Sequence, residues 1–261
     1  YRNPPRSIKE MLRSRSELRR SANCYSLLAR PESNPKVAKN MKQGVMTFPM
    51  HLAPSDLSGF NVCPKSTQGC REACLHTAGN PVYMPGKTRA RIARTKLYFQ
   101  NRELFLEFLI VEILAGIAKA NRANMVPAFR LNATSDIPWE RVKLPASLGG
   151  GTVAEFIISH GGELYDYTKR ANRKLPPGYH LTFSLAENND SDARKALNNG
   201  QNVAVVFNVK RGAPLPDQFM GYPVIDGDLS DYRPADPENS IVGLRAKGDA
   251  IGETSGFVRA A

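Results

Sequence analysis

The sequence predicts an α/β fold with mostly parallel strands, arranged as a complete or partial (β/α) barrel. In its second half, the 261-residue chain alternates short β-branched runs with helical or irregular links, a pattern typical of parallel sheets. Polar side chains follow several of these runs directly, at the place where parallel α/β folds bind their ligands. A chain of this length suits one large domain with a well-buried core.

The first 33 residues differ in composition from the rest of the chain. Residues 1–30 carry eight lysine and arginine side chains against two glutamates, which predicts a basic arm containing a short helix. Such arms often contact nucleic acid, and a solvated tail is the alternative interpretation. The arginines expected to contact nucleic acid are Arg13, Arg15, Arg19 and Arg20. We expect residues 34–261 to form the single α/β domain.

The expected elements of that domain follow in chain order. A strand at residues 47–52 precedes a cysteine-rich segment at residues 61–76 and a turn rich in glycine and proline near residues 79–86. The apolar periodicity of residues 88–120 predicts one long helix, with Asn101 as the place for a break. Further strands are expected at residues 127–131, 155–159, 164–168, 180–185, 203–207, 223–226 and 241–244, with a helical link at residues 191–199.

The polar residues that follow these strands form the candidate active site. Because the carboxyl ends of parallel strands meet at one edge of a sheet, we expect them to converge on one pocket that faces the cysteines. The predicted catalytic set is Asp136, Asp166, Tyr167, Lys169, Asp226, Asp228 and Lys247. Asp226 or Asp228 would act as a base or hydrogen-bond anchor. Lys169 or Lys247 would clamp a phosphate or carboxylate. The alternative is that these groups simply face solvent at the strand ends.

Three of the four cysteines fall within twelve residues, in the pattern Cys63-x6-Cys70-x3-Cys74. Soft thiolates bind zinc or iron–sulfur clusters, and clustered cysteines of an intracellular protein usually ligate a metal. Three thiolates fit a four-iron cluster with one open iron, or zinc with a fourth ligand from elsewhere. The candidates for that ligand are Cys24, His51 and His76. Three thiols buried as small hydrophobic groups are the alternative, and the polar residues between them argue against it.

The charge of the chain favours partners that carry phosphate. Its formal charge is +12 and its pI is near 9.7, which attracts nucleotides or nucleic acids. Lys87, Arg91 and Arg94 share one face of the predicted helix and are expected to bind phosphates there, a solvated basic face being the alternative. Residues 81–88 imitate a phosphate-binding P-loop, but Pro81 replaces its first glycine and Pro85 removes a backbone donor, so we reject it.

Several function classes lose support from the sequence. There is no G-x-S-x-G elbow of an α/β-hydrolase and no H-E-x-x-H zinc motif. No apolar run is long enough to span a bilayer, and the N-terminus lacks the apolar core of a signal peptide. We therefore expect a cytoplasmic protein with no membrane partner.

Nine sequence blocks stand out together. They are HLAPSD (51–56), NVCP with GCREACL (61–75), RLNATSDIPWE (130–140), YDYTK (165–169), YHLTFS (179–184), NVAVVF (202–207), YPVIDGD (222–228), IVGLRAKG (241–248) and SGFV (255–258). Over residues 34–258 the chain resembles the phage "gene product 88" family, found in bacteriophage genomes and related mobile elements. The resemblance implies a phage origin and an intracellular protein, and it implies no activity. It places Cys63, Cys70 and Cys74 in the family's cysteine block and leaves Cys24 outside the matched region.

Two hypotheses about function follow. The first is an iron–sulfur enzyme that binds S-adenosylmethionine, as radical enzymes do, and acts on a nucleotide or nucleic acid, as in phage DNA modification. The second is a non-enzymatic nucleic-acid-binding protein whose cysteines hold structural zinc and whose basic surfaces contact phosphates. The polar set at the strand ends favours the enzyme, while the charge supports both. The sequence predicts no oligomeric state.

Overall fold

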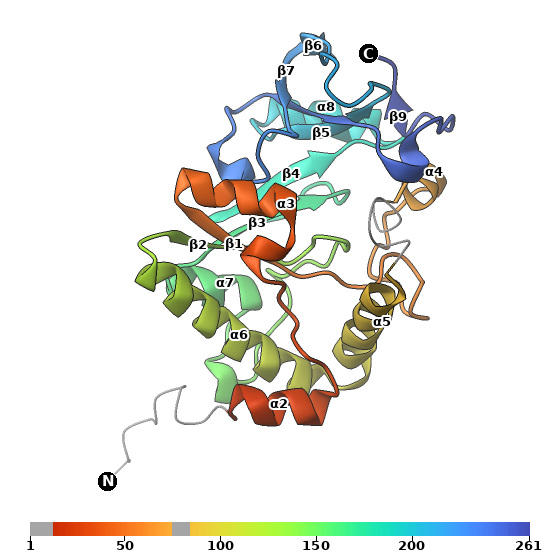
Figure 1. Cartoon of the computed structure of the whole chain (residues 1–261). Coiled ribbons are helices and arrows are strands. Elements are labelled where there is room, and N and C mark those ends of the chain that lie inside the picture. Colours follow the sequence, from red (N-terminus) through yellow and green to blue (C-terminus); the bar gives the residue numbers. More distant parts are fainter. Residues whose placement is uncertain (1–12, 75–83) are drawn as a thin grey trace.

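A single sheet of parallel strands runs through the computed structural model, which describes residues 13–74 and 84–261 (Figure 1). Within these residues the strand order is β1-β2-β3-β4-β5-β8-β7-β6, and β9 pairs with β5. Every pairing is parallel except the short β6–β7 hairpin. The strands are β1 (Val45–Pro49), β2 (Val126–Arg130), β3 (Glu163–Thr168), β4 (Tyr179–Ser184), β5 (Val203–Phe207), β6 (Gln218–Phe219), β7 (Tyr222–Asp226), β8 (Ile241–Arg245) and β9 (Val258–Arg259).

The mixed α/β class and the mostly parallel sheet are confirmed. Among the described residues β1 and β6 pair with no further strand, so the sheet stays open and does not close into a complete barrel. Because all the described strands except β6 run the same way, their carboxyl ends meet along one edge of the sheet. That edge is where the candidate site lies.

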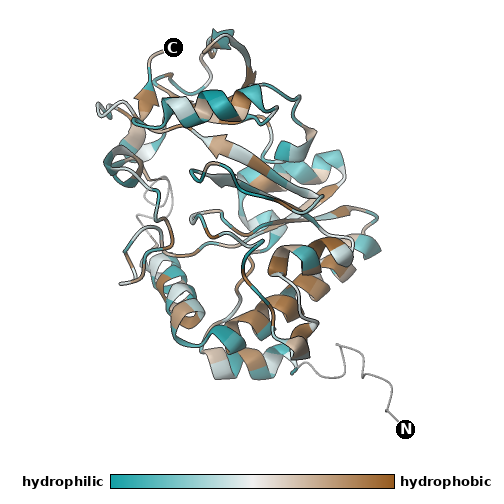
Figure 2. Ribbon diagram, turned by 180° about the vertical axis from the view of Figure 1, so that it is seen from behind, coloured by the Kyte–Doolittle hydropathy of each residue, from teal (hydrophilic) through white to brown (hydrophobic). Residues whose placement is uncertain are grey.

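Helices cover both halves of the sheet. The helices are α2 (Arg15–Ala22), α3 (Pro35–Ala38), α4 (Gln68–Glu72), α5 (Pro85–Gln100), α6 (Arg102–Arg122), α7 (Val153–Ser159) and α8 (Asp190–Asn198). Short 3₁₀ turns are η1 (Pro31–Ser33), η2 (Lys39–Gln43), η3 (Ala146–Leu148), η4 (Arg233–Ala235) and η5 (Gly248–Ala250). Figure 2 shows hydrophobic residues concentrated on α6, which packs against β1 and β2. Gly116 of α6 allows this contact, because a Cβ there would lie 3.3 Å from the Phe48 ring.

The long helix predicted over residues 88–120 is two helices, with the break at Asn101. The backbone of Asn101 leaves the helical conformation at φ −142° and ψ 71°, and its side chain accepts a hydrogen bond from the amide of Leu104 at 3.2 Å. This N-cap starts α6 in a new direction. As a result α5 stands away from α6 and is free to form one wall of the site.

One predicted strand is wrong. Residues 155–159 form most of α7, not a strand. Thr152 accepts from the amide of Glu155, and the Glu155 carboxylate accepts from the amide of Thr152, a capping box that starts a helix. Phe156 and Ile157 then face the core against the sheet. The apolar run reads like a strand, but the cap and this one-sided burial favour a helix.

The described part of the predicted arm packs on the domain. Helix α2 lies along α6, and Leu18, Leu27 and Leu28 are buried in the main core. Leu28 forms a bridge to Met50 just after β1. None of the described helices has both the length and the apolar composition that a membrane span requires.

Candidate functional site

A cavity of about 710 Å³ opens at the carboxyl ends of the parallel strands. Its walls come from residues that end or follow β1, β2, β3, β4 and β8, from the loop after β7, from α3 and α5, and from the cysteine segment. Its size falls within the range of about 300–1,000 Å³ that small-molecule sites occupy. Position and size together make it the candidate active site.

Most of the residues predicted for the site line this cavity. From the catalytic set these are Asp136, Tyr167, Lys169, Asp228 and Lys247. They are joined there by Cys63, Cys70, Cys74, Lys87, Arg91 and Arg94. Residues from strands, helix α5 and the cysteine loop, distant in sequence, thus face one space.

Asp166 does not line the cavity, although Tyr167 and Thr168, which follow it in β3, do. Strand residues alternate between faces, and Asp166 points the other way into the fold. It accepts hydrogen bonds from the amide of Asn132 at 2.7 Å and from the hydroxyl of Tyr179 at 3.0 Å. Burial raises the pKa of Asp166 to about 7. This geometry makes it a support for the loop that carries Asn132.

Asp226 also lies outside the cavity lining. Its two oxygens accept from the guanidinium of Arg245 at 2.8 and 2.9 Å. Burial acts against ionisation, but the hydrogen bonds from Arg245 outweigh it and lower the pKa of Asp226. Asp226 therefore holds Arg245, which does reach the cavity.

Positive charge dominates the cavity lining. Eight lysine and arginine side chains face three carboxylates there. The basic residues are Lys36, Lys87, Arg91, Arg94, Arg130, Lys169, Arg245 and Lys247, and the acidic ones are Asp136, Asp228 and Asp231. Such an excess inside a low-dielectric hollow attracts anions.

The three carboxylates are already engaged by the protein. Asp228 accepts from Lys247 at 2.6 Å, and the oxygens of Asp231 accept from Arg130 at 2.8 and 3.0 Å. Asp136 accepts from the Thr168 hydroxyl at 2.8 Å and from a backbone amide at 3.0 Å, and it lies 3.6 Å from the guanidinium of Arg173. Little negative charge is therefore left to neutralise the other cations.

Several donors in the cavity have no anionic partner among the described residues. Arg91 is only 8% exposed, and its Nη1 has no hydrogen-bond partner there. Arg94 donates to the backbone carbonyls of Ser26 at 2.7 Å and His51 at 3.4 Å and also contacts the thiol of Cys24. The hydroxyl of Tyr167 is also buried without a partner. Buried unpaired donors of this kind are costly, so they mark a place where a ligand would sit.

His51 borders the same wall as a neutral imidazole. Burial, together with the positive charges of Arg91 and Arg130, lowers its pKa to about 3. The ring thus adds no charge to the cavity near neutral pH, and it offers a nitrogen acceptor or donor instead.

The cysteine segment is docked on the sheet through Glu187, which follows β4. The Glu187 carboxylate accepts from the Thr67 hydroxyl at 2.6 Å and from the amide of Gly69 at 2.9 Å. Gly69 must be a glycine, since a Cβ would collide with the Ser255 hydroxyl and lie 2.8 Å from Phe257. This anchoring places Cys70 at the rim of the cavity.

The three thiols share the cavity without forming a metal site. Burial, with a smaller contribution from the nearby Cys74 and Cys70, raises the pKa of Cys63 to about 11. Cys63 Sγ lies 3.7 Å from the carbonyl oxygen of Thr134.

Within the described ranges, no group of three or more His, Cys, Asp or Glu side chains is arranged to hold a metal ion. The donor chemistry fits a soft metal, but the sulfurs are not assembled into one coordination shell. His76, a candidate fourth ligand, lies outside the described residues.

None of the four arm arginines lines the cavity, and two of them form ion pairs with α6. Arg13 pairs with Glu107 at 2.5 Å, and Arg15 pairs with the buried Glu112 at 2.5 Å. Arg19 donates to the carbonyl of Tyr25 at 2.8 Å and stacks on its ring. Arg20 is exposed and has no ion pair among the described residues.

Sequence reasoning missed four charged side chains that shape the cavity, namely Lys36, Arg130, Asp231 and Arg245. Arg130 and Arg245 are the last residues of β2 and β8, so the same strand-end rule would have included both. Lys36 precedes the first strand and Asp231 lies in a loop after β7, and neither position carries a sequence signal of its own.

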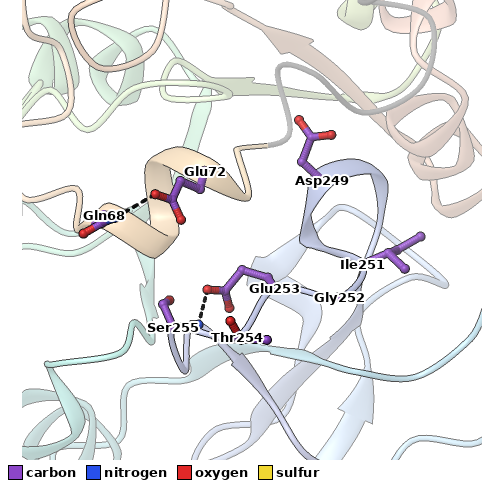
Figure 3. A pocket seen from close by; sticks show the side chains of 8 residues that line it. All are labelled: Gln68, Glu72, Asp249, Ile251, Gly252, Glu253, Thr254 and Ser255. Carbon is purple, nitrogen blue, oxygen red and sulfur yellow. Dashed lines mark hydrogen bonds between the residues drawn. The ribbon is translucent and has the colours of Figure 1, made fainter.

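A second hollow of about 420 Å³ lies between α4 and the C-terminal loop (Figure 3). Its polar groups already bond to one another: Gln68 donates to Glu72 at 2.8 Å, and the amide of Ser255 donates to Glu253 at 2.5 Å. It touches none of the strand ends between β1 and β4, so we place the site in the larger cavity.

Comparison with known proteins identifies a family and no closer relative. A family model described as Gene product 88 matches residues 26–261, which confirms the resemblance seen in the sequence. The match includes the cavity residues and starts inside the segment predicted to be an arm. No curated protein and no solved structure matches the chain.

Proposed function

This chain belongs to the gene product 88 family, and we propose that it is an enzyme that binds a phosphate-bearing substrate, a nucleotide or a nucleotide unit of nucleic acid. In this proposal the open parallel sheet works as a partial (β/α) barrel with its ligand at the carboxyl ends of the strands. The observation that carries the proposal is the cavity there, where eight basic side chains outnumber three carboxylates that are already paired.

Helix α5 supplies the proposed phosphate contacts. Arg91 and Arg94 lie three residues apart and Lys87 one turn before Arg91, so all three can face the same side of the helix. The unpartnered Nη1 of Arg91 would bind a phosphate oxygen with a charge-assisted hydrogen bond. Across the cavity, Lys169 donates to Ser184 at 2.8 Å and would turn to a second anionic group.

Asp228 and Tyr167 suit the positioning of a sugar or base. The pKa of Asp228 is lowered: burial opposes ionisation, but Lys247 and Lys36 outweigh it. An ionised carboxylate held by Lys247 favours the role of hydrogen-bond anchor over that of a base. The free hydroxyl of Tyr167 would donate to a substrate oxygen or nitrogen.

The second part of the proposal is a soft metal or an iron–sulfur cluster on Cys63, Cys70 and Cys74. Three thiols of one short segment at the rim of a substrate-sized cavity support it. Binding would require the three sulfurs to move into one shell. When bound, a four-iron cluster with an open iron would hold S-adenosylmethionine and supply radical chemistry, as for the modification of DNA.

The test of substrate binding compares ligands that differ in phosphate alone. Isothermal titration calorimetry with a nucleoside and with its 5′-monophosphate should show binding only for the monophosphate. Equal affinity for the two, or no heat with either, would contradict the proposal.

A second experiment separates the enzyme from a non-enzymatic protein with structural zinc. After anaerobic purification and reconstitution with iron and sulfide, the enzyme proposal predicts a brown protein that absorbs near 400 nm. A colourless protein with one zinc per chain would favour the alternative. The pairing of Arg13 and Arg15 with glutamates of α6 speaks against an arm devoted to nucleic acid.

A further inference from the structure

Lys36 brings an amine into the cavity that the proposed function leaves unused. It lies in α3, before the first strand, and its side chain is 29% exposed while lining the cavity. Its Nζ is 3.9 Å from an oxygen of Asp228 and 3.9 Å from an oxygen of Asp231. Both distances exceed a hydrogen bond, and no described residue accepts a hydrogen bond from Nζ.

Both neighbouring carboxylates are bound more tightly by other cations. Arg130 donates to both oxygens of Asp231 at 2.8 and 3.0 Å, and Lys247 donates to Asp228 at 2.6 Å. Arg245 also lies 3.4 Å from Asp228, so Lys36 is the weakest partner in a group of four cations and two carboxylates. If Lys36 moves away, Asp231 keeps its pairing with Arg130 and Asp228 keeps its pairing with Lys247, so no buried carboxylate is left without a cation.

The surroundings also favour the neutral amine. Burial is the main cause that lowers the pKa of Lys36 to about 8; Arg130 and Arg233 act in the same direction, and Asp231 and Asp228 act against it. About a tenth of the amine is then neutral at pH 7, against less than a thousandth for an ordinary lysine. Neutral lysines in such pockets are the ones that attack carbonyl groups.

We propose that Lys36 forms an imine with an aldehyde or ketone substrate that also carries a phosphate, an inference that rests on the proposed phosphate-binding cavity. The Nζ lone pair adds to the carbonyl carbon, and the carbonyl oxygen becomes the hydroxyl of a carbinolamine. That oxygen then leaves as water, taking the two hydrogens of the amine, and a C=N bond forms. No oxidant or reductant is consumed.

Two sources share this chemistry. A phosphorylated sugar in its open-chain form presents an aldehyde, and so does a nucleotide of a nucleic acid that has lost its base. In both, a phosphate and a carbonyl lie within one sugar of each other. The basic residues of α5 would hold the phosphate while Lys36 meets the carbonyl.

Imine trapping tests the proposal on the full chain. The protein is incubated with ribose 5-phosphate, with ribose, or with an oligonucleotide that contains one abasic site. Sodium cyanoborohydride reduces any imine, and peptide mass spectrometry locates the adduct. We expect one adduct at Lys36 with a phosphorylated probe, with a yield that rises as the pH passes about 8. The reacting probe identifies the source.

Matched variants keep the test decisive. Lys36→Arg retains the charge and removes the amine, so it should abolish the adduct while leaving phosphate binding within about twofold. Lys42→Met, which removes an exposed lysine nearby, should leave the adduct unchanged. Labelling spread over many lysines, or equal labelling in Lys36→Arg, overturns the proposal. Equal labelling of Lys36 by ribose and ribose 5-phosphate would overturn the phosphate-binding function instead.

Discussion

The guanidinium of Arg130 donates to both carboxylate oxygens of Asp231, at 2.8 and 3.0 Å. The pair joins the end of β2 to the loop after β7 beside the cavity, and Asp231 is only 1% exposed. Burial opposes the charge of Asp231, yet Arg130 and Lys36 keep its pKa lowered. The ion pair therefore ties two elements of the cavity wall together.

Asp231→Asn should destabilise the fold. The substitution leaves Arg130 with its side chain 17% exposed and no carboxylate partner, which typically costs about 3–5 kcal/mol. Urea unfolding measures the loss, with Asp217→Asn as the control because Asp217 is exposed. The control should change the free energy of unfolding by less than about 0.5 kcal/mol. An Asp231→Asn variant with an unchanged free energy of unfolding would show that the ion pair does not stabilise the fold.

Asp166 should make stability depend on pH. Its pKa is about 7 in the folded chain, above its unfolded value, so between about pH 4 and 7 the folded state binds more protons than the unfolded state. The free energy of unfolding should therefore fall as pH rises through that window and level off above it. Asp166→Asn should flatten this fall, by up to about 4 kcal/mol between the two ends. Parallel pH profiles of the two proteins would refute the assignment.

Each cavity cysteine should be needed for metal binding. We expect Cys63→Ser, Cys70→Ser and Cys74→Ser each to lower the iron bound after anaerobic reconstitution by at least half. Cys24→Ser is the matched control, because Cys24 lies outside the cavity lining, where its thiol donates to the carbonyl of Ser26. Metal analysis and absorbance near 400 nm measure the outcome. Retention of iron in all three cavity variants would exclude the proposed centre.

Two arginines of α2 should behave differently. Arg15→Met leaves Glu112, whose side chain is 2% exposed, with only backbone amides as partners. We expect a loss of stability of about 1–3 kcal/mol and little change in affinity for nucleic acid. Arg20→Met should leave stability unchanged and weaken any salt-dependent binding of an oligonucleotide. The reverse pattern would mean that Arg15 is a nucleic-acid contact.

The fold was largely predictable because parallel strands carry a strong signal. β5 is a continuous apolar run with four of its five residues buried. A run of this kind can be identified as a buried parallel strand from its own sequence. The sequence of helix α7 predicts a strand because its Phe and Ile residues are also common in strands. Thr152 and Glu155, which form a capping box, were the signal for a helix. Closure of the sheet depends on strand pairing across the whole chain, which no local pattern reports.

The site was predictable only in part, for a geometric reason. The position near a strand end predicts a site role for both Asp166 and Tyr167. Side chains alternate between the two faces of a strand, so Tyr167 lines the cavity while Asp166 points into the fold. Which face of β3 borders the cavity depends on how the sheet packs against the rest of the fold, and the local sequence does not determine it. Lys36 was not predicted as a site residue because its segment has no periodic pattern. Only the tertiary structure brings it to the cavity.

Binding of a nucleoside 5′-monophosphate to the Arg91→Met variant tests the central claim most directly. Arg91 is buried, lines the cavity and has an unpartnered Nη1 among the described residues, so its loss should weaken binding by about ten- to a hundredfold. Lys96→Met removes an exposed charge of the same helix and should leave affinity within about twofold. Equal affinity of wild type, Arg91→Met and Lys96→Met in calorimetry would contradict a phosphate site in the cavity.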